Sequence, residues 1–196
     1  MKPQLNRREV VKSLLHNRGD LILVTGLGAA SWDSAAAGDH ALSFPLWGGM
    51  GGAVMVGLGL ALAQPSRRVL VITGDGEALM GIGAFATTAK CNTSNLSIVV
   101  LDNELYGETG RQQTHTAFKT DLAAVALACG FPSASTIRTQ PDVDSLRNHV
   151  HESKALSLTV VKVALTDDPA ALPPREGSFL KNRMREALVG PGAILE

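Results

Sequence analysis

The sequence predicts an α/β fold of three layers, with an open and mainly parallel sheet between two layers of helices. Short apolar runs rich in β-branched residues recur along the chain, and such runs are typical of strands that are buried on both faces. Stretches with helical periodicity lie between these runs, as in sheets whose parallel strands are joined by helices. The 196 residues, of which 45% are hydrophobic and 18% charged, are enough for one compact domain.

The expected elements follow one another in a regular order. The chain opens with an amphipathic helix, because Asn6 and Glu9 have the spacing of a capping box and apolar residues from Val10 to Leu15 share one helical face. Strands are expected at residues 21–25, 69–73, 96–101 and 158–163, with a weaker candidate at 133–137. Helices are expected at residues 29–37, 50–63, 79–90, 121–129 and 142–153.

The composition changes after residue 165. Residues 1–165 are expected to form the α/β domain, and residues 166–196 a Pro-rich linker and a C-terminal helical tail. We expect a helix at residues 179–188 that docks on a neighbouring surface.

Charge and cysteine content exclude several classes of protein. Lys plus Arg equal Asp plus Glu at 18 each, which indicates neither a nucleic-acid partner nor a membrane surface. The longest apolar run, residues 51–63, is well short of the roughly 20 residues that span a bilayer. The first 20 residues contain no uninterrupted apolar stretch, so we expect no secretory signal. Cys91 and Cys129 lack the spacing of a disulfide framework, a zinc site or an iron–sulfur cluster. We therefore expect a cytoplasmic protein.

Three turns rich in glycine or polar residues follow predicted strands, at the edge where parallel sheets bind ligands. The first, residues 26–31, loosely matches the dinucleotide fingerprint, but the acidic residue expected at the end of a second strand is missing. A dinucleotide-binding module therefore stays an alternative.

The other two turns predict a magnesium and diphosphate site. Asp75 lies between Gly74 and Gly76, where a buried strand ends and a helix begins; glycines let a phosphate approach the backbone, and helix N-termini attract anions. Because a carboxylate would repel a phosphate, Asp75 implies a cation between the two. Asn103 follows the next strand, and Asp, Asn and main-chain oxygens are ligands that suit Mg²⁺.

These two turns, GDGEALM and LDNELYG, resemble the GDG…N signature of thiamine diphosphate enzymes. The resemblance implies the thiamine diphosphate-binding fold and its diphosphate-binding domain. It implies that Asp75 and Asn103 are the side-chain ligands of Mg²⁺ and that Leu105 supplies a main-chain carbonyl ligand. The residues to which it assigns cofactor contacts are Gly48, Gly49, Met50, Gly74, Asp75, Gly76, Glu77, Ala78, Asn103, Leu105, Tyr106 and Gly107.

Two residues depart from the family pattern. Asp102 stands where many relatives have Asn, and Glu77 stands where Ser is common. Glu77 adds negative charge beside the diphosphate, so its side chain is expected either to point away or to meet a cation.

Segments on either side extend the resemblance. Upstream, WGGMGGA resembles the family's G-x-M-G element, in which Met50 would hold the cofactor in its bent conformation and the carbonyl of Gly48 would accept a hydrogen bond from the aminopyrimidine. Downstream, YGETGRQQT resembles a loop of the two-chain sulfopyruvate and phosphonopyruvate decarboxylases. In and beside that loop, Arg111, Gln112 and His115 are candidates for contacts with substrate or cofactor.

The resemblance implies a subunit of a hetero-oligomeric, non-oxidative 2-oxoacid decarboxylase. The glutamate that activates the cofactor belongs to the family's pyrimidine-binding domain, so we expect a separate subunit to supply it in trans, within a larger hetero-oligomer. The substrate would be a small anionic 2-oxoacid, and Arg111 could complement a sulfonate or phosphonate group. An acetolactate synthase-like carboligase subunit and a non-catalytic cofactor-binding module remain alternatives. The β chains of 2-oxoacid:ferredoxin oxidoreductases share the turns, but typically use four cysteines for a cluster, and this chain has two.

Overall fold

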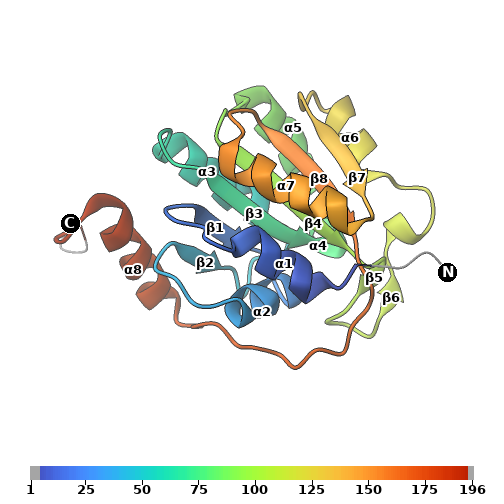
Figure 1. The fold of residues 1–196 in the computed structure, drawn as a ribbon, viewed down its shortest axis with the longest axis horizontal. Coiled ribbons are helices and arrows are strands. Elements are labelled where there is room, and N and C mark those ends of the chain that lie inside the picture. Colours follow the sequence, from blue (N-terminus) through green and yellow to red (C-terminus); the bar gives the residue numbers. More distant parts are fainter. Residues whose placement is uncertain (1–4, 194–196) are drawn as a thin grey trace.

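The computed structural model describes residues 5–193, whose elements form three layers (Figure 1). Six parallel strands form one sheet in the order β2-β1-β3-β4-β8-β7. The strands are β1 (Ile22–Thr25), β2 (Ser43–Pro45), β3 (Val69–Gly74), β4 (Leu96–Asp102), β7 (Ala134–Ile137) and β8 (Ser157–Lys162). The predicted three-layer α/β fold with a parallel sheet is therefore confirmed.

Helices cover both faces of this sheet. Successive strand residues point to opposite sides, and because the central strands are largely apolar, both faces must be buried. Leu23 belongs to the apolar cluster on one face, and its neighbour Ile22 belongs to the cluster on the other. The first face is covered by α1 (Arg7–Leu15), α2 (Ala29–Ala36) and α7 (Gln140–Glu152). The second is covered by α3 (Ala53–Ala63), α4 (Asp75–Met80), α5 (Gly83–Cys91) and α6 (Leu122–Ala128).

The expected capping box at the start of α1 is partly present. The backbone N–H of Glu9 donates to Oδ1 of Asn6 at 3.0 Å, which satisfies one of the free donors at the helix start.

Two predicted helices have different bounds because two glycines meet beside the sheet. The helix expected at residues 50–63 begins at Ala53, since Gly51 has a φ of +92° that ends the preceding turn. The helix expected at residues 79–90 is divided into α4 and α5 at Gly81. A Cβ atom added to Gly81 would lie 2.2 Å from the carbonyl oxygen of Gly51, so the two backbones touch where α4 ends. The predicted single helix was therefore wrong, and α4 begins at Asp75 itself.

Short elements after β1 and β4 were not expected from the sequence. The edge strand β2 has three residues, and the hairpin of β5 (Leu105–Tyr106) and β6 (Gln112–Gln113) has two in each strand. A 3₁₀ turn, η1 (His115–Ala117), follows the hairpin. Such short segments carry too little periodicity to be recognised from one sequence.

The chain after β8 runs along the outside of the molecule to α8 (Gly177–Val189), which lies beside the β2 edge of the sheet (Figure 1). Leu180 and Met184 of α8 are buried, and Arg183 forms an ion pair of 2.6 Å with Asp39. The helix expected at residues 179–188 is therefore slightly longer, and it packs on its own chain. Within residues 5–193, no helix is both long and apolar enough to cross a membrane.

Candidate cofactor site

The carboxyl ends of β1, β3 and β4 border a cavity of about 410 Å³. All three predicted turns contribute to its lining, together with the glycine-rich segment before α3 and the chain that follows β8. The sequence-predicted residues in its lining are Met50, Gly74, Asp75, Gly76, Glu77, Asn103, Leu105, Tyr106, Gly107 and Arg111. The sequence-predicted residues outside its lining are Gly48, Gly49, Ala78, Gln112 and His115.

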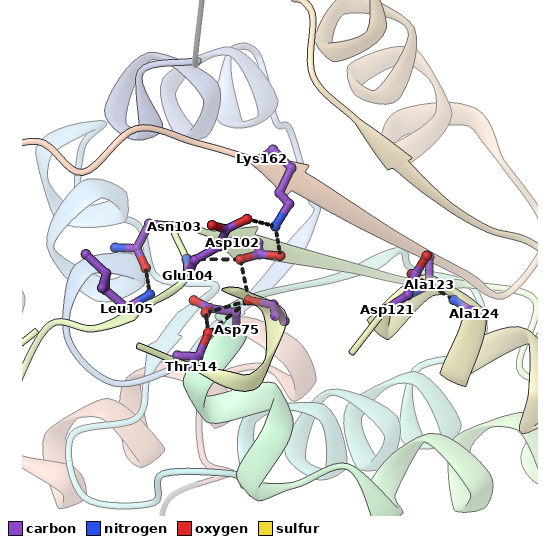
Figure 2. Close-up of polar contacts among 11 residues, drawn as sticks. Asp75, Asp102, Asn103, Glu104, Leu105, Thr114, Asp121, Ala123, Ala124 and Lys162 are labelled. Carbon is purple, nitrogen blue, oxygen red and sulfur yellow. Dashed lines mark hydrogen bonds and ion pairs between the residues drawn. The ribbon is translucent and has the colours of Figure 1, made fainter. Parts of the chain in front are cut away.

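Asp75 is a buried carboxylate with one oxygen left open. Only 2% of its surface is exposed, and its Oδ2 accepts a hydrogen bond from Oγ1 of Thr114 at 2.5 Å (Figure 2). A second, longer contact of 3.2 Å joins Oδ2 to Oγ1 of Thr116. No side chain of residues 5–193 donates to Oδ1. Burial, against the hydrogen bond from Thr114 and helped by the charge of Asp102, raises the pKa of Asp75 to about 6. A cation at Oδ1 would offset this cost of burial.

Asn103 and Leu105 place two more oxygen atoms at the cavity. Oδ1 of Asn103 accepts a hydrogen bond from the backbone N–H of Leu105 at 3.0 Å, and Glu104 between them has a φ of +66° (Figure 2). The carbonyls of Glu104 and Tyr106 accept bonds across the hairpin, from Thr114 and Arg111, both at 2.9 Å. Successive carbonyls alternate along a strand, so the carbonyl of Leu105 points away from that partner strand.

This donor set fits Mg²⁺ bound together with a diphosphate. A carboxylate, an amide oxygen and a main-chain carbonyl are hard ligands, and Mg²⁺ completes its shell with phosphate oxygens and water. The described residues hold no group of three or more His, Cys, Asp or Glu side chains that could bind a metal. A site made of Asp75, Asn103 and a carbonyl would therefore depend on the phosphates for the rest of its ligands.

The contacts of Glu77 show what its side chain does beside the diphosphate-binding turn. Its carboxylate accepts hydrogen bonds from the backbone N–H groups of Leu27 at 3.1 Å and Gly51 at 3.3 Å, and from the hydroxyl of Thr73 at 2.9 Å. Burial raises the pKa of Glu77, and these donors lower it. No cation pairs with Glu77 in the described part of the chain, so the second of the two alternatives, contact with a cation, is not found there. Glu77 instead joins the turn after β1, the glycine-rich segment and the start of α4.

The turn after β1 is occupied by carboxylates, which argues against a dinucleotide there. A Cβ atom added to Gly26 would lie 1.5 Å from Oε2 of Glu77, and one added to Gly28 would lie 2.5 Å from Oε1 of Glu108. The two glycines therefore make room for acidic side chains, whereas in the dinucleotide fingerprint they make room for a pyrophosphate.

The loop after β5 covers the start of α4. A Cβ atom added to Gly76 would lie 2.5 Å from the ring of Tyr106, so the ring rests on this glycine. Farther along, Nη2 of Arg111 donates to Oδ1 of Asp167 at 2.6 Å, and both side chains are exposed. Residues from the chain after β8 thus reach the rim of the cavity and contact this loop there.

Several residues around the cavity were missed by sequence reasoning. Thr114 and Thr116 hold Asp75, and a buried arginine, Arg7, lines the cavity and pairs with the fully buried Asp33. The first two lie in the quoted loop motif or just beyond it, but nothing in the motif says which carboxylate they contact. Arg7 looks like a surface residue of an amphipathic helix, and only the tertiary structure brings it to Asp33.

Comparisons with known proteins agree with this geometry. Residues 26–163 match the family model described as "Thiamine pyrophosphate enzyme, C-terminal TPP binding domain", and thiamine pyrophosphate is another name for thiamine diphosphate. The chain is 32% identical over 185 residues to the sulfopyruvate decarboxylase subunit beta of Methanocaldococcus jannaschii, covering 93% of this chain and 96% of that one. It is 35% identical over 159 residues to the phosphonopyruvate decarboxylase of Streptomyces hygroscopicus, covering 80% of this chain and 36% of that one.

A solved structure shares the fold. The benzoylformate decarboxylase of Polynucleobacter necessarius superposes with a TM-score of 0.72 at 19% identity, covering 84% of this chain and 34% of that chain. The chain belongs to the thiamine diphosphate enzyme family and carries its C-terminal cofactor-binding domain.

Proposed function

We propose that this chain is the thiamine diphosphate-binding subunit of a non-oxidative 2-oxoacid decarboxylase whose substrate carries a second anionic group. The observation that carries the proposal is the similarity to a sulfopyruvate decarboxylase subunit beta, which extends over 96% of that relative. A phosphonopyruvate decarboxylase is similar over most of this chain as well. Sulfonate and phosphonate are both tetrahedral anions, so the shared chemistry is a 2-oxoacid with an oxyanion at its other end.

The chain's own residues would hold and orient the cofactor. Asp75, Asn103 and the carbonyl of Leu105 would bind Mg²⁺, and the glycine-flanked start of α4 would face the diphosphate. Met50 lines the same cavity, from the segment that Glu77 holds through Gly51. When bound, thiamine diphosphate supplies the electron sink that takes up the electron pair of the broken C–C bond as a 2-oxoacid loses carbon dioxide.

We further propose that a second subunit supplies the glutamate that activates the cofactor. Among the described residues, two glutamates line the cavity. Glu77 is committed to three donors of its own chain, and Glu108 packs against Gly28 in the turn after β1. The relative over whose length the similarity extends is itself named a subunit beta, which supports a partner chain.

The partner can be tested by native mass spectrometry of the protein purified gently from its own host with Mg²⁺ and thiamine diphosphate present. We expect a complex with a second kind of chain that retains the cofactor. Decarboxylation of 2-oxo-3-sulfopropanoate should require both chains, and replacing the partner's cofactor-activating glutamate by glutamine should abolish it. Full activity of this chain alone would contradict the proposal of a glutamate in trans.

Arg111 is the proposed contact for the second anion of the substrate. It lies at the rim of the cavity, where its exposed pair with Asp167 is weak enough to be exchanged for a substrate oxyanion. We expect Arg111→Ala to raise KM for a sulfonate- or phosphonate-bearing 2-oxoacid at least about tenfold, roughly 1.4 kcal/mol, and to change KM for pyruvate much less.

Lys119→Ala is the matched control, since Lys119 is an exposed cation farther along the chain, just after η1. It should leave both KM values unchanged. An Arg111→Ala enzyme with the wild-type KM for every anionic substrate would remove Arg111 from the proposal.

A further inference from the structure

Lys162 binds both acidic residues that flank Asn103. It is the last residue of β8, and its backbone is paired with Asp102 at the end of β4. Its Nζ donates to Oδ2 of Asp102 at 2.8 Å and to Oε1 of Glu104 at 2.5 Å, while its side chain is only 13% exposed (Figure 2). The ammonium group therefore holds the chain on both sides of Asn103.

Asn103 lies at the cavity, between the two residues that Lys162 holds. Asn103 lines the cavity, and Lys162 does not. The chain forms a turn here, because Glu104 has a φ of +66° and Oδ1 of Asn103 accepts the backbone N–H of Leu105. Binding of Asp102 and Glu104 to one ammonium group therefore fixes the two ends of this turn and, with them, the place of Asn103.

The same network reaches the other proposed metal ligand. Oγ1 of Thr116 lies 2.8 Å from Oδ1 of Asp102 and 3.2 Å from Oδ2 of Asp75, so its one proton is shared between the two carboxylates. Thr114 contacts both Thr116 and Asp75. Within residues 5–193, Lys162 is the cation in direct contact with this network of three carboxylates.

We propose that Lys162 is a positioning residue of the Mg²⁺ site, acting through Asp102 and Glu104 on Asn103 and through Asp102 and Thr116 on Asp75. The inference rests on the proposed function, because it concerns the metal that would hold the diphosphate. It also gives a reason for the departure at Asp102: a carboxylate there can bind a lysine from the neighbouring strand, which the amide of an asparagine would bind less strongly.

A role in position and a role in charge predict opposite effects on metal binding. If Lys162 acted only through its charge, its removal would leave the site more negative and would strengthen Mg²⁺ binding. If Lys162 holds Asn103 and Asp75 in place, its removal weakens Mg²⁺ binding, because the ligands must be ordered when the metal enters. The sign of the change therefore distinguishes the two roles.

The test measures the Mg²⁺ concentration at which binding of thiamine diphosphate is half-maximal. Binding is measured by calorimetry on the 196-residue chain. Lys162→Met should raise that concentration at least fivefold. The double variant Asp102→Asn with Lys162→Met removes one charge of each sign and leaves no unpaired buried carboxylate, so it keeps both the fold and the net charge of the site. Its asparagine oxygen can still accept from Thr116, and we expect it to show the same weakening.

Controls separate the inference from the proposed function. Lys154→Met removes an exposed lysine and should bind Mg²⁺ as the wild type does. Unchanged or tighter Mg²⁺ binding by the double variant would overturn the role of Lys162 while leaving the proposed function intact. Binding of thiamine diphosphate by the wild type without any dependence on Mg²⁺ would overturn the metal site and this inference together.

Discussion

Replacement of Asp75 by alanine is expected to abolish Mg²⁺-dependent binding of thiamine diphosphate. Asp75 is the one proposed ligand that carries a charge, and it is buried beside the cavity with Oδ1 open. Without it, Mg²⁺ keeps only neutral protein ligands, and no negative charge of the protein attracts the metal at this position. We expect the affinity for the cofactor at fixed Mg²⁺ to fall at least about 100-fold, roughly 2.7 kcal/mol, as measured by calorimetry.

Two further variants control for the loss of a side chain. Asp75→Asn keeps the shape and one oxygen but not the charge, so it should fall between alanine and the wild type. Asp20→Ala removes an exposed carboxylate from the turn before β1, at the opposite end of that strand, and should have no effect. Wild-type affinity of Asp75→Ala would show that the metal is bound elsewhere.

Glu77→Ala should have the largest effect on stability. Its carboxylate accepts three hydrogen bonds in the interior, and bonds to a charged acceptor contribute about 1.5–3 kcal/mol each. Removing it leaves the N–H groups of Leu27 and Gly51 and the hydroxyl of Thr73 without that acceptor. We expect a loss of at least about 3 kcal/mol in the free energy of unfolding, measured with urea, together with weaker cofactor binding because Met50 adjoins the released segment.

Variants that alter the same contact by other means should agree. Glu77→Gln keeps the shape but puts an amide N–H among donors, so its loss of stability should be smaller but clear. Gly26→Ala would press a methyl group onto the Glu77 carboxylate and should destabilise the fold as well. Gly59→Ala, at an exposed position of α3 with open space around it, is the matched control and should be neutral or stabilising. An unfolding free energy within 1 kcal/mol of the wild type for Glu77→Ala, about the size of one ordinary hydrogen bond, would contradict this account of Glu77.

The long elements of the fold could be predicted because their patterns are strong. The buried strands around residues 69–73 and 96–101 and the helix after Asn6 have clear apolar periodicity and lie where expected. The break between α4 and α5 could not be predicted, because it depends on the contact of Gly81 with Gly51, 30 residues earlier in the sequence. Apolar periodicity describes one segment of the sequence at a time, so it cannot reveal a contact between the backbones of two distant segments.

The candidate site could be predicted only as far as its motifs extend. The turns with Asp75 and Asn103 can be recognised in the sequence by their glycines and by side chains that suit Mg²⁺. The structure brings both turns to one cavity. Their supporting residues give no comparable signal. Lys162 looks like a strand residue at the edge of an apolar run, and its contacts follow from the register of β8 on β4. The partners of Glu77 are mostly backbone N–H groups, whose positions no sequence motif reveals.

The most direct test of the central claim is a crystal structure with thiamine diphosphate and Mn²⁺, which takes the same oxygen ligands as Mg²⁺ and can be located by its anomalous scattering. The account predicts one Mn²⁺ peak in the cavity, within about 2.3 Å of Oδ1 of Asp75, Oδ1 of Asn103 and the carbonyl oxygen of Leu105, with the diphosphate completing its shell. A peak that contacts neither Asp75 nor Asn103, or a bound cofactor without any metal beside it, would contradict the account.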